Sequence, residues 1–480
     1  MPIFFLPGNY WDAATLEYGF VKENLSGIEI WYREAGSYFQ LVLLNLIFLL
    51  YKFTFLSHDF LFDLLTVLSL ILFCYEIKKY AKTVFEFDNY LGNLCAIFII
   101  SFPVWHTLVA FNLGLYLICF YLALLGYRLL ISKKLLISLI GIIIILFSFS
   151  IKSNFSFIIG LSLAHNFRLF SNSQSIKKYS LSIIIILCSS SYFINAHFFP
   201  PFGMLEGYNL VELEKITFIN LITDLRNFLT FFIFYLWVPI LYLLILKLKK
   251  KHILLSNLFR KKDLIDYFII SIIFFTSIFP YMLANRSTDL FFISDYNGRH
   301  AYLLSMSFGL FFTVILKKIN ELYSLKKVPF LILFIFIFQN LFILGGGYYT
   351  KIETAIFKND FVSKLKKIEE PPGGSIQVLN SQIPGYFRKA EGNYLFFKAY
   401  GKASWWVNYF DQKEKKNFKT PEFILNRSDY KTKYVLDDFK QKCSTIIKLE
   451  NEINKIDRIY KFYIFNSKEY FKINVLSSNC

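Results

Sequence analysis

The sequence predicts a mainly α-helical, polytopic membrane protein with a small α/β domain at its C-terminal end. Two observations lead to this fold class. Apolar runs of about 15 to 25 residues recur from about residue 38 to 346, in a chain of 480 residues that is 55% hydrophobic. After residue 346 these runs stop, and charged sequence with turn signals such as "EEPPGGS" follows.

The apolar runs have the length that a bilayer requires. A hydrocarbon core of ~30 Å takes about 20 residues of helix, and backbone groups in lipid must bond within their own segment. The stretch 38–56 is ambiguous, since it is apolar enough to span but contains Lys52 and lies only a few residues before the next run. We expect about 10 to 11 transmembrane helices, with clear spans near 58–76, 91–104, 107–131, 135–150, 154–166, 180–196, 227–247, 264–283, 301–316 and 328–346.

Three parts of the chain follow from these spans. Residues 1–57 form a first extracytoplasmic loop with interfacial helices, residues 58–346 form the transmembrane helical domain, and residues 347–480 form the C-terminal domain. Short alternating stretches such as "YKFYIF" at 460–465 favour strands in this last part. The N-terminus has no signal-peptide pattern.

The basic residues of the short loops predict the orientation. Loops 76–90, 127–134, 166–179, 247–263 and 317–327 hold 20 Lys and Arg, whereas loops 104–106, 151–153, 197–226 and 284–300 hold 5. Basic loops stay in the cytoplasm. The second set of loops and the whole C-terminal domain are therefore expected outside it.

Composition argues against several other classes. The formal charge of +18 is spread between the C-terminal domain and the membrane loops, so nucleic-acid binding is a poor explanation. Cysteines have no zinc-binding spacing, no phosphate-cradling glycine loop is present, and no ligands cluster in sequence, so we predict neither metal nor cofactor. A Cys443–Cys480 disulfide is one possibility if the C-terminal domain faces an oxidising compartment.

Charged residues beside the outer membrane face are the candidate site residues, because an ion near lipid is costly unless it is paired, solvated or used. Each also has a structural alternative. Lys152 can be a snorkelling lysine, Arg299 a plain interfacial arginine, and His300 a structural or interfacial histidine. Arg299 opposes the dipole of the helix that it opens, which favours an anionic ligand. The remaining candidates are Asp12 in "NYWDAATLEYGF", and Arg33 and Glu34 in "WYREAGSYF".

The order of these motifs resembles a family. An acid soon after the start of a long first outer loop, a basic–aromatic stretch, a short outer turn with Lys and an "RY"-like helix start are similar to the GT-C membrane glycosyltransferases. The most similar branch contains protein O-mannosyltransferases and lipid A aminoarabinose transferases. "WDAATLEYGFVKENLSG" stands where that family has its catalytic Asp-Glu, with Asp12 matching the acid and Ala13 replacing the second acid.

Further stretches match in the same order. "REAGSYFQLVLLNLIFLLYKF" looks like the family's basic–Pro-Pro–aromatic stretch and interfacial helix, "IKSNFSFIIGL" resembles its "TKGP" turn, and "GRHAYLL" resembles its "RYLLP" helix start. The C-terminal domain fits by position only. Family members begin with a transmembrane helix before the first outer loop, and "MPIFFLPG" corresponds at most to its final turn.

The resemblance implies an inverting sugar transfer from a polyprenyl-phosphate donor at the outer face of a bacterial inner membrane. Arg33, Lys152 and Arg299 would bind the phosphate leaving group, and Asp12 would act as general base on the acceptor hydroxyl. The acceptor is a surface glycan, a lipid or a protein. Alternatively, Asp12 is the N-cap of a helix that begins with "AATLEYGF".

Additional substrate-binding candidates lie near the same motifs. Trp11 can stack on a sugar ring, although an interfacial aromatic belt is the simpler explanation, and Glu17, Glu34 and His300 are further candidate contacts. Two other functions stay open. An O-antigen-type polysaccharide polymerase would use arginines of two large outer loops, and a transporter or flippase of lipid-linked glycans would be expected to show repeated, broken helices.

Overall fold

A computed structural model of the chain describes residues 13–172, 178–205, 261–283, 301–323, 328–379, 389–410, 428–440, 443–451 and 471–479, together with 237, 240, 244 and 426. The described chain is mostly helical and ends in a small β-sheet, as the sequence predicts. The predicted span 227–247 and the alternating stretch 460–465 fall largely or wholly outside these residues.

The helices follow the apolar runs closely. Their bounds are α1 Ala13–Val21, α2 Ser26–Glu34, α3 Tyr38–Phe53, α4 His58–Phe85, α5 Asn89–Ile100, η2 Pro103–Val109, α6 Phe111–Leu130, α7 Leu135–Ser148, α8 Ser153–Ser171, α9 Lys178–Phe198, η3 Gly203–Leu205, α12 Lys261–Leu283, α13 Leu304–Tyr323, α14 Val328–Leu365, α15 Lys389–Tyr400 and α17 Ser428–Lys433. Helix α14 continues well beyond residue 346, where the sequence predicts the end of the last span.

Side-chain caps set two of the helix starts. The Ser57 hydroxyl accepts a hydrogen bond from the Phe60 amide at 3.2 Å at the start of α4. The Asp88 carboxylate accepts one from the Leu91 amide at 2.7 Å at the start of α5. Such caps satisfy amides that have no partner inside the helix.

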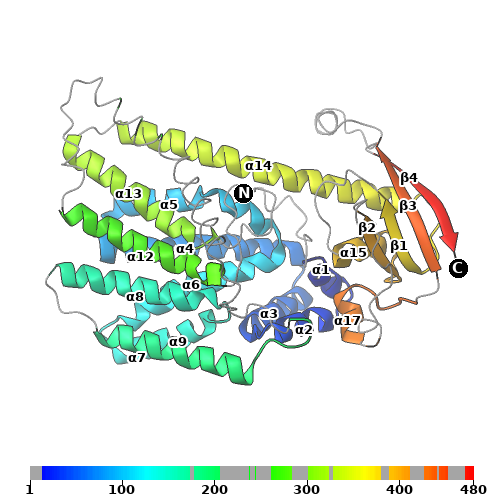
Figure 1. Ribbon diagram of the computed structural model, residues 1–480, viewed down its shortest axis with the longest axis horizontal. Helices are drawn as coiled ribbons and strands as arrows, with labels where there is room; N and C mark the ends of the chain where they lie inside the picture. Colours follow the sequence, from blue (N-terminus) through cyan, green and yellow to red (C-terminus); the bar gives the residue numbers. More distant parts are fainter. Residues whose placement is uncertain are drawn as a thin grey trace.

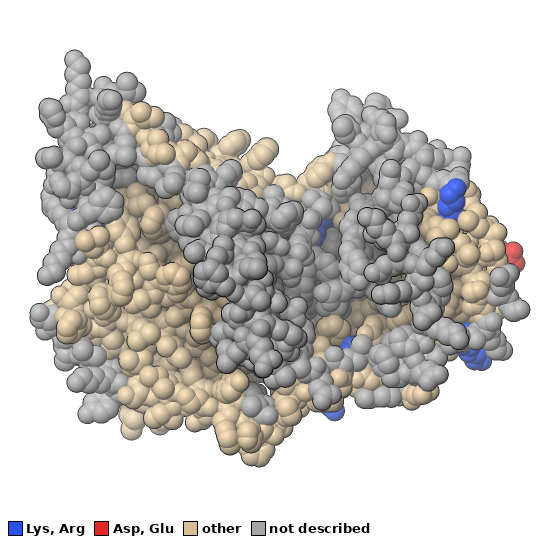
Figure 2. Space-filling model, viewed as in Figure 1, with Lys and Arg blue, Asp and Glu red and all other residues tan. Residues whose placement is uncertain are grey.

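Four of the described helices are long and apolar enough to cross a membrane: His58–Phe85, Leu113–Leu130, Leu264–Met282 and Leu333–Leu365. Shorter apolar helices of 10 to 17 residues lie at Tyr38–Phe53, Asn89–Ile100, Leu135–Ser148 and Leu181–Ile194. The described part of the helical bundle shows few charged side chains on the face seen in Figure 2, whereas charged side chains lie over the C-terminal part. An uncharged apolar surface of this kind is what lipid contact requires.

The C-terminal part holds a four-stranded mixed sheet with the order β2-β1-β3-β4. Strand β1 (Gly374–Leu379) pairs in parallel with both β2 (Trp405–Phe410) and β3 (Cys443–Asn451), and β4 (Phe471–Asn479) pairs with β3 in the antiparallel direction. The alternating side chains Ile376, Val378 and Val407 pack with Phe361 of α14 and Phe396 of α15. Cys443 is disulfide-bonded, and its predicted partner Cys480 lies outside the described residues.

The helices form an elongated bundle with the C-terminal sheet beyond one end (Figure 1). Helix α14 runs along the bundle and reaches the sheet, because its 38 residues extend over about 57 Å at 1.5 Å per residue. Helices α1, α2, α15 and α17 lie between the bundle and the sheet in Figure 1, where α1 contacts α15 and α2 contacts α17. The first residues described therefore meet the last third of the chain.

Candidate functional site

The contacts between the ends of α4, α8 and α13 show at which end of the bundle the predicted site segments lie. Helices α4 and α8 meet through their last turns, where the Arg168 guanidinium donates a hydrogen bond to the Val84 carbonyl at 2.5 Å. Lys317, in the C-terminal half of α13, donates to the neighbouring Phe85 carbonyl at 3.4 Å. The starts of α4, α8 and α13 consequently lie at the opposite end, which is the end that faces α1, α2 and the sheet.

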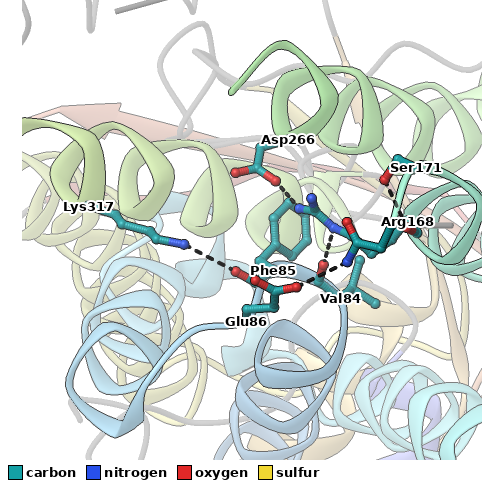
Figure 3. Close-up of polar contacts among 8 residues, drawn as sticks. Val84, Phe85, Glu86, Arg168, Ser171, Asp266 and Lys317 are labelled. Atoms are coloured by element: carbon teal, nitrogen blue, oxygen red, sulfur yellow. Dashed lines mark hydrogen bonds and ion pairs between the residues drawn. The ribbon is translucent and has the colours of Figure 1, made fainter. Parts of the chain in front are cut away.

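The contacts at the end of the bundle remote from the sheet hold four helices together (Figure 3). Asp266 of α12 forms an ion pair with Arg168, Glu86 accepts from the Asn172 side chain at 3.1 Å, and the Ser171 hydroxyl donates to the Arg168 carbonyl at 2.8 Å. Arg168 and Asp266 are both buried. Most of these residues belong to the loops that the sequence assigns to the cytoplasm. The charges of Arg168, Asp266 and Glu86 have a structural role, because they join the helices at this end.

Lys152 lies directly before α8, at the end of the bundle that faces the sheet. Its side chain reaches the surface, but protein atoms packed around the amine exclude part of the water, and this burial lowers the pKa of Lys152. No hydrogen bond or ion pair joins its amine to another described residue. A cation in this position is available to an anionic ligand.

Arg33 lies in the last turn of α2 and is also accessible. Its guanidinium is 3.8 Å from the Glu29 carboxylate one turn earlier, and its side chain is 58% exposed. An exposed pair at this distance contributes little to stability, so the arginine can turn toward a ligand at little cost.

Glu34 has a different environment from its neighbour Arg33. It is completely buried, its Oε2 atom is 3.1 Å from the Lys433 amine, and its Oε1 atom accepts a hydrogen bond from the Tyr430 hydroxyl. The Lys433 amine also lies 4.5 Å from the ring centre of Trp31. Both oxygens of Glu34 therefore have partners within the protein, and they join α2 to α17.

Glycine allows this close contact. A Cβ atom on Gly27 would overlap the backbone at Thr432 and Lys433, and Gly203, which has a φ of +63°, lies against Glu34. Only glycine adopts such a φ readily without strain. The Phe202 amide donates to the Glu34 carbonyl at 3.2 Å, so the loop after α9 joins the same contact.

Glu17 belongs to a second charged group at this junction. Its Oε1 atom is 3.0 Å from the Lys398 amine of α15, and it interacts electrostatically with Asp59 at the start of α4. Burial and then the charge of Glu17 raise the pKa of Tyr394. We call Glu17, Asp59, Asp63 and Lys398 the junction cluster.

Asp59 and Asp63 were not predicted as site residues from the sequence. Both lie in the first two turns of the apolar helix α4. An ionisable residue in an apolar segment is a functional candidate by default, so their position in the sequence is the signal that could have identified them. Lys398, Tyr430 and Lys433 gave no comparable signal, since they lie in mixed polar sequence. Within the described part of the chain, no group of three or more His, Cys, Asp and Glu side chains is arranged to hold a metal ion.

The other predicted site residues lie outside the described part. These are Trp11, Asp12, Arg299 and His300. Their described neighbours are Ala13, which begins α1, and Ala301, which is buried three residues before α13. Helix α1 covers the "AATLEYGF" stretch for which a helix is expected. No family model, curated protein or solved structure matches the chain.

Proposed function

We propose that the protein is a membrane glycosyltransferase that moves a sugar from a polyprenyl-phosphate donor to a glycan, lipid or protein acceptor at the outer face of a bacterial inner membrane. One observation supports this most strongly. The described segments that carry or adjoin the predicted site residues, at the starts of α1, α8 and α13 and the end of α2, lie at one end of the bundle.

The chemistry of the accessible cations fits a phosphate leaving group. Arg33 is exposed, and Lys152 reaches the surface at the start of a helix, where backbone amides and the helix dipole also favour an anion. With Arg299 they would stabilise the charge that grows on the phosphate as the bond to the sugar breaks. Asp12 would take the proton of the attacking acceptor hydroxyl.

The orientation belongs to the same proposal. The Arg168 contacts occupy the end that the basic loops assign to the cytoplasm, and the C-terminal domain lies at the other end. A disulfide at Cys443 is expected in an oxidising compartment and not in the cytoplasm. Both observations support an extracytoplasmic C-terminal domain.

The test uses the purified chain in lipid nanodiscs with polyprenyl-phosphate hexoses and pentoses as donors and a cell-envelope extract as acceptor. Free polyprenyl phosphate, measured by mass spectrometry, reports transfer. Asp12→Asn, and Arg33→Ala combined with Lys152→Ala, should lower transfer by about 100-fold or more, whereas Glu370→Gln on the exposed face of the C-terminal part should not.

A transporter or flippase gives the opposite pattern. It would move the intact lipid-linked sugar across the bilayer of a vesicle without releasing polyprenyl phosphate, and Asp12→Asn would leave this movement unchanged. That result would contradict the glycosyltransferase proposal.

A further inference from the structure

A strip of helix α6 lies between two neighbouring helices and is only partly covered. Helix α6 packs on α4 at Gly114, where an added Cβ would overlap the Thr66 hydroxyl, and on α7 at Gly126, where a Cβ would approach Ile145 to 2.8 Å. Twelve residues separate the two glycines, so these two faces are about 120° apart around the helix axis. Partly exposed side chains lie between the two faces and at the α4 edge. We call them the α6 strip: Tyr121, Leu122, Leu125, Arg128 and Leu129.

Exposed apolar side chains of α4 and α7 border the α6 strip. Leu68 and Leu72 are exposed one turn apart on α4, and Leu136 and Ile140 are exposed one turn apart on α7. Residues four apart lie on the same side of a helix, so each neighbour presents an apolar edge. The α6 strip therefore forms the floor of an apolar surface that three helices build.

Helix α3 covers the same side of the bundle nearer to the sheet. It contributes Leu44 to a buried cluster that also contains Leu61 of α4 and Ile118 of α6. The ring centre of Phe39 of α3 lies 4.8 Å from that of Phe147, which is on the same side of α7 as Ile140. Beyond α3, toward the end of the bundle remote from the sheet, no described helix covers the exposed apolar edges.

Cations lie at this uncovered end of the α6 strip. The Nε and Nη2 atoms of Arg128 donate hydrogen bonds to the Glu76 carboxylate of α4 at 2.6 and 3.0 Å. The Arg128 side chain is nevertheless 38% exposed, and its Nη1 atom has no hydrogen bond with a described residue. The Lys79 amine, one turn after Glu76, lies 4.3 Å from the ring centre of Tyr75. Both contacts hold a cation at the surface beside the strip.

Two further lysines follow Arg128 in the α6–α7 turn. Lys133 and Lys134 are exposed, and neither amine forms an ion pair with a residue that the structure describes. Both oxygens of Glu76 already bond to Arg128, so this carboxylate balances neither these two lysines nor Lys79. Basic side chains between membrane helices, beside a headgroup layer, favour an anionic lipid.

The apolar part of the surface identifies the kind of anion. From Leu68 to Lys79, helix α4 rises about 16 Å at 1.5 Å per residue, which is about half of the ~30 Å hydrocarbon core of a bilayer. Tyr75 and then Lys79 end this exposed stripe, which is the order expected where a membrane helix enters the headgroup layer. A soluble anion would contact only the cations, whereas a lipid anion also covers the apolar side chains.

We propose that the α6 strip binds one phospholipid with an anionic headgroup, in the leaflet at the end of the bundle remote from the sheet. The lipid phosphate interacts with Lys79, Arg128 and the lysines of the α6–α7 turn. The acyl chains lie along the α6 strip, between Leu72 of α4 and Ile140 of α7. This inference needs neither glycosyl transfer nor a particular orientation of the protein, so it can fail or hold independently of the proposed function.

Native mass spectrometry of the purified chain, released from detergent micelles, measures the lipids that stay bound. The probes are phosphatidylglycerol and phosphatidylethanolamine with the same palmitoyl and oleoyl chains, and glycerophosphoglycerol as the soluble headgroup without acyl chains. The wild type should bind one phosphatidylglycerol at least about 10-fold more tightly than phosphatidylethanolamine, because several basic side chains face the headgroup. Glycerophosphoglycerol should not bind measurably.

The test variant changes the three lysines and keeps Arg128, since its loss would leave the buried Glu76 without a counter-ion. Lys79→Gln combined with Lys133→Gln and Lys134→Gln should weaken phosphatidylglycerol binding by about 10- to 100-fold and leave phosphatidylethanolamine binding unchanged.

A matched control removes the same charge from the C-terminal part. Lys366→Gln combined with Lys367→Gln and Lys402→Gln changes three exposed lysines and should bind phosphatidylglycerol like the wild type. Thermal unfolding shows whether each variant folds. A phosphatidylglycerol with a photoreactive acyl chain gives a second readout on the wild type, where cross-links should fall on α4, α6 and α7.

Each outcome supports or overturns the site. Equal binding of the two phospholipids by the wild type would reduce the surface to ordinary lipid contact. Unchanged phosphatidylglycerol binding in the folded test variant, or an equal loss in the control, would overturn the assignment to the α6 strip. Tight binding of glycerophosphoglycerol would replace the lipid with a soluble anion. If the test variant does not fold, cross-links confined to other helices would overturn the proposal.

Discussion

The buried Glu34 carboxylate lies 3.1 Å from the Lys433 amine, although 399 residues separate them in the chain. Their side chains are 0% and 2% exposed, and they join the second helix of the chain to the C-terminal part. A charge buried this deeply is tolerated only with its partner. The first helices and the C-terminal part are therefore held together by specific contacts.

Removing one member of this pair should be severely destabilising. Glu34→Gln leaves the Lys433 ammonium buried without its counter-ion, and such a loss costs about 3–5 kcal/mol. The matched control is Glu370→Gln, which breaks an exposed pair with Lys402 and should cost about 0–1 kcal/mol. Thermal unfolding in nanodiscs measures both, and equal midpoints for the two variants would contradict a tight junction.

Gly27 should be intolerant of any side chain. Gly27→Ala places a Cβ against the backbone at Lys433, so α2 and α17 must separate, and overpacking of this kind costs about 1–3 kcal/mol. Gly345→Ala is the control, because a Cβ there meets nothing within 4 Å on helix α14 and should stabilise the helix by up to about 1 kcal/mol. The unfolding midpoint should fall in Gly27→Ala and rise in Gly345→Ala. A lower midpoint in Gly345→Ala would contradict a continuous helix α14 through residue 345.

The Arg168 ion pair should stabilise the other end of the bundle. Arg168→Gln leaves Asp266 buried without its counter-ion, and we expect a loss of about 3–5 kcal/mol. Lys134→Gln, which changes an exposed lysine of the α6–α7 turn, should alter stability by less than about 0.5 kcal/mol. If Asp266→Asn in the Arg168→Gln background destabilises as much as it does alone, the two residues are not coupled.

Lys152 predicts a specific pH dependence of donor use. Burial lowers its pKa below the ordinary lysine value of about 10.4, so the amine loses its charge at a lower pH than an ordinary lysine does. The kcat/KM for the polyprenyl-phosphate donor should accordingly fall as the pH rises through this lowered pKa. Lys152→Arg remains charged and should remove that fall. The same alkaline limb in wild type and Lys152→Arg would exclude Lys152 as its origin.

Cysteine labelling tests the orientation. In a background without the six native cysteines, Ser26→Cys at the start of α2 and Lys134→Cys in the α6–α7 turn lie near opposite ends of the bundle. An impermeant thiol reagent on intact cells should label Ser26→Cys and should reach Lys134→Cys only after lysis. The reverse result would put α1, α2 and the C-terminal part in the cytoplasm and remove the basis of the site.

Most helices of this protein can be predicted from the amino-acid sequence alone. Runs such as 135–150 and 264–283 match α7 and α12 closely, because apolar length and local hydrogen bonding decide a membrane helix without reference to distant residues. The mixed character of the C-terminal part, with its strands, was also predictable. The continuation of α14 to Leu365 goes beyond the predicted span 328–346, because three glycines at 345–347, which are poor helix formers, lie inside the helix.

Which charges meet is visible only in the folded chain. Glu34 and Lys433 are far apart in sequence, as are Glu17 and Lys398, and neither pair follows any local pattern. The sequence placed Arg33 and Glu34 together as candidates, yet the two have different surroundings, one exposed and one enclosed by α17. Helical spacing determines the face of a residue on its own helix, but which helix covers that face depends on packing of the whole chain.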